Sequence, residues 1–140
     1  MQEGKDIDVM QAVSVRETMT TKMDTVSLEM PLDRLALEFE QSHHHGFPVV
    51  NADGKLAGVV TIQDFERVLD DGSLEGKTVA EIATLDSLVV VYDDEPMWSA
   101  LKKLGLRDVG RLPVVKREDE GELVGVIRRK ILSRLATWQL

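Results

Sequence analysis

The sequence contains no cysteine and few aromatic residues, namely two Trp, one Tyr and three Phe in 140 residues. Without cysteine the chain forms neither disulfides nor thiolate metal sites, which suits a reducing compartment. No apolar run approaches the roughly 20 residues that span a bilayer, and residues 1–10 lack the apolar core of a signal peptide. We therefore expect a soluble chain whose hydrophobic residues, 43% of the total, form one compact unit or two small units that share a core.

Basic residues are also in the minority, with 17 Lys and Arg against 25 Asp and Glu and a net charge of −8. This balance argues against a nucleic-acid or anionic-membrane surface. The deficit lies in the first half, where residues 1–70 carry 6 cations against 13 acids, net −7, while residues 71–140 carry 11 against 12, net −1. Any anion site should therefore draw its cations from the second half.

The side chains of an enzyme active site are not apparent, because no nucleophile–base pair, metal-ligand cluster or P-loop is present. The three histidines are consecutive, at 43–45, and consecutive side chains point in different directions on a helix or strand. We expect no catalytic residues and no metal site, and we expect these histidines to close a helix. Acidic clusters at 93–95 and 118–120 are interpreted as solvated charges, and divalent cation binding by them is left open.

The stretch 46–64 contains the clearest local pattern. Residues 47–50 and 56–60 are short apolar runs, and residues 51–54 between them include Asn, Asp and Gly, which tolerate a positive φ. This pattern predicts a β-hairpin.

Thr61 and Asp64 follow the hairpin with the spacing of a capping box, in front of apolar residues at helical spacing. The first amide groups of such a helix can hold a phosphate or a sugar. The alternative is that the two side chains only cap their own helix.

A second helix is predicted before the hairpin, with Pro31 at its first position. Apolar residues follow at helical spacing, at Leu32, Leu35, Ala36 and Phe39. We expect this helix to end at 42–45, with Gly46 as a left-handed terminal residue. Upstream, residues 15–19 are expected to form one helical turn and residues 25–28 a short strand.

The same order of predicted elements then repeats in the second half of the chain. Pro31 and Pro48 are 17 residues apart, and so are Pro96 and Pro113. Residues 112–127 repeat the two strands of the hairpin after a loop that is two residues longer. The chain therefore contains two β-α-β-β-α repeats. A small sheet alone leaves one face uncovered, so we predict an α+β fold in which the two sheets pack about a pseudo-two-fold axis and clefts form where the repeats meet. The expected organisation is a linker at 1–14, repeat 1 at 15–71, a linker at 72–78 and repeat 2 at 79–137.

A duplicated unit with this order of elements, a Pro-Val-Val strand and a Thr-x-x-Asp helix start resembles the CBS domain, and the tandem pair resembles a Bateman module. The resemblance covers residues 15–137. It implies a regulatory module, not an enzyme, that binds AMP, ADP, ATP or S-adenosylmethionine in the clefts between the repeats. It also implies a homodimer of CBS pairs that controls an attached protein, with no nucleic-acid partner and no cofactor besides the nucleotide.

The sequences of residues 44–50 and 107–115 resemble one subgroup in particular, the cytosolic CBS pair of prokaryotic CLC-type chloride channels and transporters. Residues 4–8 resemble the linker that follows the membrane domain in those proteins. This likeness implies that the chain lies on the cytoplasmic side of a membrane as part of a larger ion-transport protein.

In the family's motif, the Thr and Asp at the second helix start bind phosphate and ribose, and the base lies against the first strand and the Pro-Val-Val strand. The resemblance therefore favours a ligand role over a capping role for Thr61 and Asp64. It implies the following nucleotide-binding residues: Thr25, Val26, His45, Phe47, Pro48, Thr61 and Asp64. Arg128 is a further candidate, although it does not follow from the motif. For Val26 and Phe47, core packing is the alternative.

The second repeat departs from the motif, because Arg128 and Ile131 stand where the first repeat has Thr61 and Asp64. Isoleucine cannot accept a ribose hydroxyl, so we expect at most one conventional nucleoside site. Arg128 either reaches the phosphates of a nucleotide held by Asp64 or belongs to a solvated basic patch. Arg107 and Arg111 are either structural ion pairs or cations of a cleft. The competing function is a ligand-free dimerisation module in which Asp64 only caps its helix.

Overall fold

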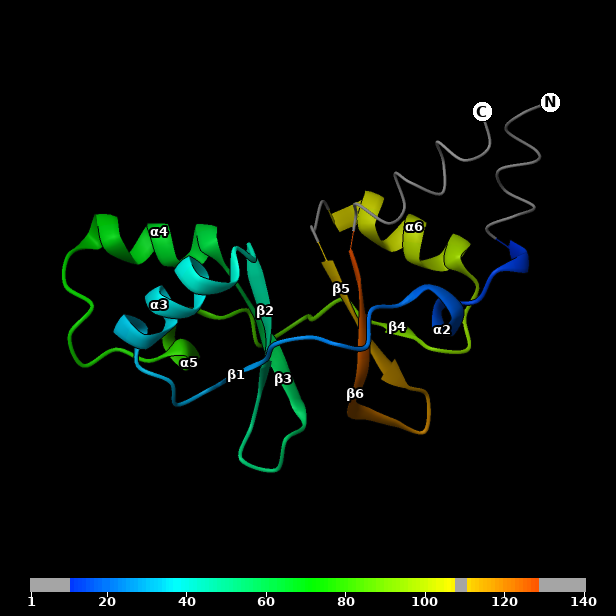
Figure 1. Cartoon of the computed structure of the whole chain (residues 1–140), viewed down its shortest axis with the longest axis horizontal. Helices are drawn as coiled ribbons and strands as arrows, with labels where there is room; N and C mark the ends of the chain where they lie inside the picture. The colour runs from blue at the N-terminus through cyan, green and yellow to red at the C-terminus, as the bar shows by residue number, and fades with distance from the viewer. Residues whose placement is uncertain (1–10, 108–110, 129–140) are drawn as a thin grey trace. The chain divides into compact units, whose positions relative to one another are not determined.

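The computed structural model describes residues 11–107 and 111–128 (Figure 1). The chain divides into two compact units, of which unit 1 comprises Met1–Met23 with Val89–Leu140 and unit 2 comprises Asp24–Leu88. In the described ranges no helix has the length and apolar character needed to cross a membrane.

Unit 2 is built on a three-stranded sheet of order β1-β2-β3. Its elements are β1 (Val26–Ser27), α3 (Leu32–Ser42), β2 (Gly46–Val50), β3 (Leu56–Thr61), α4 (Ile62–Asp71) and α5 (Val79–Ile82). β1 runs parallel to β2, and β2 pairs antiparallel with β3 through the predicted hairpin. The hairpin turn contains Gly54 at a φ of 77°, as its turn chemistry predicts.

Unit 1 repeats this topology with a sheet of order β4-β5-β6. Its elements are α2 (Val15–Thr18), β4 (Val91–Tyr92), α6 (Met97–Arg107), β5 (Arg111–Lys116) and β6 (Asp119–Arg128). The strand registers agree, because Val49 pairs with Gly58 in one sheet and Val114 pairs with Gly125 in the other. The α+β class is confirmed; the helix expected after Arg128 lies outside the described residues.

The two short helices α2 and α5 each pack on the sheet of the other repeat. α2 comes from repeat 1 but lies in unit 1, whose sheet comes from repeat 2, and α5 comes from repeat 2 but lies in unit 2, whose sheet comes from repeat 1. Beyond α2, Thr20 bridges Val126 of β6, and beyond α5, Thr84 bridges Val59 of β3. Gly58 makes the bridge between Thr84 and Val59 possible, since a Cβ at this position would lie 2.4 Å from the carbonyl oxygen of Thr84. The repeats of the sequence and the compact units of the fold therefore do not coincide.

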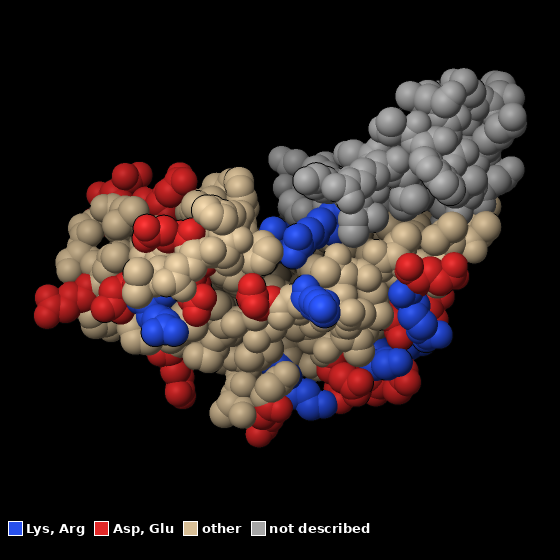
Figure 2. Space-filling view, in the orientation of Figure 1, with Lys and Arg blue, Asp and Glu red and all other residues tan. Residues whose placement is uncertain are grey.

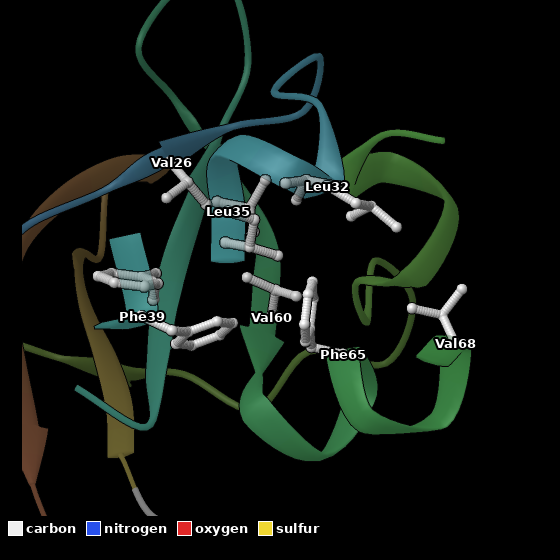
Figure 3. Close-up of a cluster of buried hydrophobic side chains, with 10 residues drawn as sticks. Val26, Leu32, Leu35, Phe39, Val60, Phe65 and Val68 are labelled. Atoms are coloured by element: carbon white, nitrogen blue, oxygen red, sulfur yellow. The ribbon is translucent and has the colours of Figure 1, made fainter. Parts of the chain in front are cut away.

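Each unit has its own core. The core of unit 2 gathers side chains from the three strands of its sheet and from three helices, and it includes Phe39 and Phe65 (Figure 3). The ring centroids of Phe39 and Phe47 are 5.1 Å apart, within the range of favourable aromatic pairs. The core of unit 1 is aliphatic and includes Val15 of α2.

The end of α3 differs from its prediction. His43, and not Gly46, adopts the left-handed conformation, with a φ of 60°, and its amide donates to the carbonyl of Phe39. Gly46 instead begins β2, where a Cβ would lie 3.0 Å from the carbonyl oxygen of Val60. The glycine is therefore explained by close packing of two strands, and the expectation of a terminal glycine was wrong.

Candidate ligand-binding site

The start of α4 carries the predicted capping box. The hydroxyl of Thr61 accepts from the amide of Asp64 at 3.2 Å, and Oδ2 of Asp64 accepts from the amide and hydroxyl of Thr61 at 2.9 and 3.0 Å. This geometry confirms the capping interaction that the sequence pattern predicts. It shows how the local sequence fixes both side chains at a helix N-terminus.

Asp64 retains acceptor capacity beyond the cap. Its side chain is 11% exposed, and its second oxygen, Oδ1, lies 3.4 Å from Nη1 of Arg67, a largely exposed side chain. An ionised carboxylate offers about four lone-pair sites, so the capping bonds to Oδ2 leave Oδ1 able to accept from a further donor. A diol or amine that displaces Arg67 can therefore meet a fixed carboxylate beside the positive end of a helix.

Of the other sequence-predicted residues of unit 2, His45 lies next to the start of α4, whereas Val26 pairs with Val49, near the other end of β2. Thr25 directly precedes β1, and the carbonyl of His45, directly before β2, accepts from the amide of Ile62 at 2.9 Å. Gly46 pairs with Thr61 at the end of β3. The backbone therefore brings the start of β2 and the start of α4 together.

The side chains of these residues differ in exposure. Thr25 and His45 are exposed, whereas Val26, Phe47 and Pro48 are buried. Val26 and Phe47 belong to the core of unit 2, which is the packing alternative that the sequence leaves open. Contact of either side chain with a base stays a prediction.

His44 is a neighbour that sequence reasoning did not single out. Its Nε2 lies 3.5 Å from Oδ2 of Asp24, and its ring meets Phe47 edge to face with centroids 5.7 Å apart. The run of three histidines was the sequence feature that could have indicated His44, but of the three only His45 was assigned to the ligand from the sequence. The structure shows that His44 links the start of β1 to that of β2.

In unit 1, Arg111 pairs with Arg128 across β5 and β6 at the position that Gly46 and Thr61 occupy in unit 2. The register therefore confirms that Arg128 stands at the place of Thr61. Nε of Arg128 is buried and has no hydrogen-bond partner. Ile131 and residues 129–130 lie outside the described residues, as does the side chain of Arg107.

The acidic cluster at 93–95 is not simply solvated, and for Asp93 that interpretation was wrong. Asp93 is 4% exposed, and its Oδ2 accepts from Nε and Nη2 of Arg16 at 3.1 and 3.0 Å and from Nζ of Lys116 at 3.0 Å. Burial alone would raise the pKa of Asp93, but the hydrogen bonds and charges of Lys116 and Arg16 outweigh it and lower the pKa. The carboxylate thus fastens α2 to unit 1.

Comparison with known proteins identifies the repeated unit. The family model described as CBS domain matches residues 15–71 and 79–136. A homoserine O-acetyltransferase of Methanococcoides burtonii is 32% identical over 123 residues, a match that covers 87% of this chain and 24% of that enzyme. The chain therefore spans about a quarter of that relative's length.

Solved structures agree with the fold. The crystal structure of CBSX2 in complex with AMP has a TM-score of 0.75 and 25% identity, and the match covers 90% of this chain and 97% of that chain. The CBS domain of a bacterial CNNM/CorC family Mg²⁺ transporter has a TM-score of 0.79 and 25% identity, covering 96% of this chain and 83% of that chain.

Proposed function

The chain belongs to the CBS-domain family, and from that premise we propose that it is a regulatory module that binds an adenosine nucleotide at the start of α4. Asp64 accepts the ribose hydroxyls, while Thr61 and the helix N-terminus face the phosphate. Thr25, His45 and Pro48, with Val26 and Phe47 beneath, contact the base.

The observation that carries the proposal is the fixed carboxylate of Asp64, with Oδ1 outside the capping bonds to Oδ2 and held 3.4 Å from an exposed arginine. A ribose hydroxyl that replaces Arg67 at Oδ1 leaves the capping box intact. The complex of CBSX2 with AMP supports an adenosine ligand, and AMP, ADP and ATP are the candidates. Because the match covers 24% of the homoserine O-acetyltransferase, we carry over none of that enzyme's activity.

The attached protein is, in this proposal, a membrane transporter. The similarity to the CBS domain of a CNNM/CorC family Mg²⁺ transporter supports an attached transporter. The sequences of residues 44–50 and 107–115 favour a CLC-type chloride channel or transporter. The module then lies on the cytoplasmic side of the membrane and acts as a homodimer of CBS pairs. A nucleotide shifts such a module between shapes only by its differential affinity for them.

A ligand-free dimerisation module is the second candidate, and the completed capping box favours it. Both side chains of the motif already satisfy the backbone of α4, and Val26 and Phe47 already fill the core. In that case Asp64 contributes to stability alone.

Calorimetric titration of the chain with adenosine, AMP, ADP and ATP distinguishes the two candidates. Asp64→Ala should weaken nucleotide binding about ten-fold or more, the loss expected for hydrogen bonds to a charged group. Asp33→Ala is the matched control, because Asp33 is an exposed acid in the first turn of α3. Failure of every adenosine compound to bind the folded chain would leave the dimerisation module as the function.

A further inference from the structure

The short helices α2 and α5 dock on their units through equivalent backbone hydrogen bonds. In unit 1, the amide of Arg16 donates to the carbonyl of Asp93 at 3.0 Å. In unit 2, the amide of Ala80 donates to the carbonyl of Leu28 at 2.9 Å. Both helices have four residues, and each buries its first valine in the core of its unit. These contacts therefore do not distinguish one helix from the other.

The chain that leaves each helix also pairs in the same way. Thr20 exchanges two backbone hydrogen bonds with Val126 of β6, of 2.9 and 3.0 Å. Thr84 exchanges two with Val59 of β3, of 2.9 and 3.1 Å. Because these bonds join backbone atoms, and a threonine follows both helices at the same distance, they do not favour one helix over the other either.

Side chains distinguish the two docking sites. Three equivalent positions carry charges in unit 1 and uncharged side chains in unit 2, namely Arg16 against Ala80, Asp93 against Leu28 and Lys116 against Asn51. Leu28 packs against the core of unit 2, and the side chain of Asn51 accepts from two amides of its own hairpin turn. The fold therefore does not need charges at this place to dock a short helix.

In unit 1, Arg16, Asp93 and Lys116 form an ion triad. Asp93 is 4% exposed, and its Oδ2 lies 3.0 Å both from Nη2 of Arg16 and from Nζ of Lys116. Figure 2 shows basic and acidic side chains side by side over α2 and the turn between β5 and β6.

The stability of the ion triad does not by itself explain its presence. Taking charges out of water is costly, so replacing a whole buried ion cluster with apolar side chains of similar volume is often neutral or stabilising. Leu28 is the apolar solution to the same packing problem, within the same chain. What a buried ion cluster adds over an apolar contact is a requirement for one particular partner.

Exchange of the two helices would break the ion triad. With α5 on unit 1, Ala80 would stand beside Asp93, and the buried carboxylate would lose its two hydrogen bonds from the guanidinium of Arg16. With α2 on unit 2, Arg16 would meet Leu28, whose side chain has no acceptor. Both changes disfavour the exchanged arrangement, because a buried charge that loses a partner is strongly destabilising.

We propose that the ion triad is a specificity contact that directs α2 to unit 1 and leaves unit 2 to α5. Because α2 follows residues 1–14, which the sequence predicts to be a linker, the ion triad also decides to which unit that linker is joined. The inference does not depend on nucleotide binding, since Asp64 and the start of α4 take no part in the ion triad.

The test is a triple variant of the full chain that gives unit 1 the side chains of unit 2, by Arg16→Ala, Asp93→Leu and Lys116→Asn. Its urea midpoint should lie at or above that of wild type. Its NMR spectrum should nevertheless contain a second set of amide signals from about a tenth or more of the molecules. Nuclear Overhauser effects identify the arrangement, because Thr20 contacts Val126 in the native form and Val59 in the exchanged form.

The matched control removes the neighbouring exposed ion pair, by Asp94→Asn and Arg117→Gln. This pair joins the ends of β4 and β5 and not α2, so the control should give one set of signals, as wild type does.

Arg16→Ala alone is the second variant, and it keeps the experiment decisive if the triple variant does not fold. Asp93 then retains Lys116 as its partner, and the exchanged form should be present at a lower population than in the triple variant. If the folded variants give only native signals, or a second set without the contact between Thr20 and Val59, the proposal is wrong. A lowered midpoint together with native signals alone would show that the ion triad supplies stability and not specificity.

Discussion

Replacing Asp93 with Asn tests the contact that fastens α2 to unit 1. The substitution keeps the shape of the side chain and leaves no cavity, but it removes the charge that accepts three hydrogen bonds from Arg16 and Lys116. The two cations left behind are 60% and 33% exposed, so water can solvate them. The cost should therefore lie below that of a fully buried unpaired charge, at about 2–3 kcal/mol of unfolding free energy.

Urea unfolding followed by circular dichroism measures this cost as a shift of the midpoint. Asp94→Asn is the matched control, because Asp94 pairs with Arg117 at the exposed surface and its loss should leave the midpoint nearly unchanged. Arg16→Met adds a double-mutant cycle, and its effect should largely vanish in the Asp93→Asn background. If Asp93→Asn is no more destabilising than Asp94→Asn, the carboxylate does not hold α2 in place.

The same contact predicts a pH dependence. The pKa of Asp93 is lowered in the folded chain, so its stabilising contribution is fully present above the unfolded pKa of about 3.9 and is lost as the pH falls through the folded value. The difference in unfolding free energy between wild type and Asp93→Asn should stay constant from neutral pH to about pH 5 and shrink below about pH 4. A difference that persists unchanged at pH 3 would contradict an ionic origin.

Four further substitutions test the fold by urea unfolding. Gly58→Ala should lower the free energy of unfolding by about 1–3 kcal/mol, because the added Cβ would lie 2.4 Å from the backbone oxygen of Thr84. Gly125→Ala should lower it less, because the nearest atom is the flexible sulfur of a methionine at 2.7 Å. Equal losses for the two variants would refute this reasoning. Thr61→Ala should cost about 1 kcal/mol through the lost cap, and a neutral result would contradict the capping role. Phe39→Ala should cost about 3–5 kcal/mol, since its ring contacts two other aromatic rings in the core; a smaller loss would show that the core refills the space.

Local features of the molecule were predictable from the sequence because neighbouring residues determine them. The hairpin follows from two apolar runs around a turn, and the cap of α4 follows from Thr61 and Asp64 at a fixed spacing. The end of α3 was not predictable in detail. His43 adopts the left-handed conformation at the end of α3, and Gly46 lies further on, where two strands approach closely.

The sequence by itself determined the duplication, the order of elements in each repeat and the family, since regular spacing of Pro, Gly and apolar residues encodes them directly. Only the tertiary structure decided which residues that lie far apart in the chain contact each other. Arg16 and Asp93 are separated by 77 residues, and no periodicity links them. The exchange of α2 and α5 between the units depends on where the chain crosses from one unit to the other, and the opposition of Arg111 and Arg128 depends on strand register. Both are set when each sheet forms and not by any single segment.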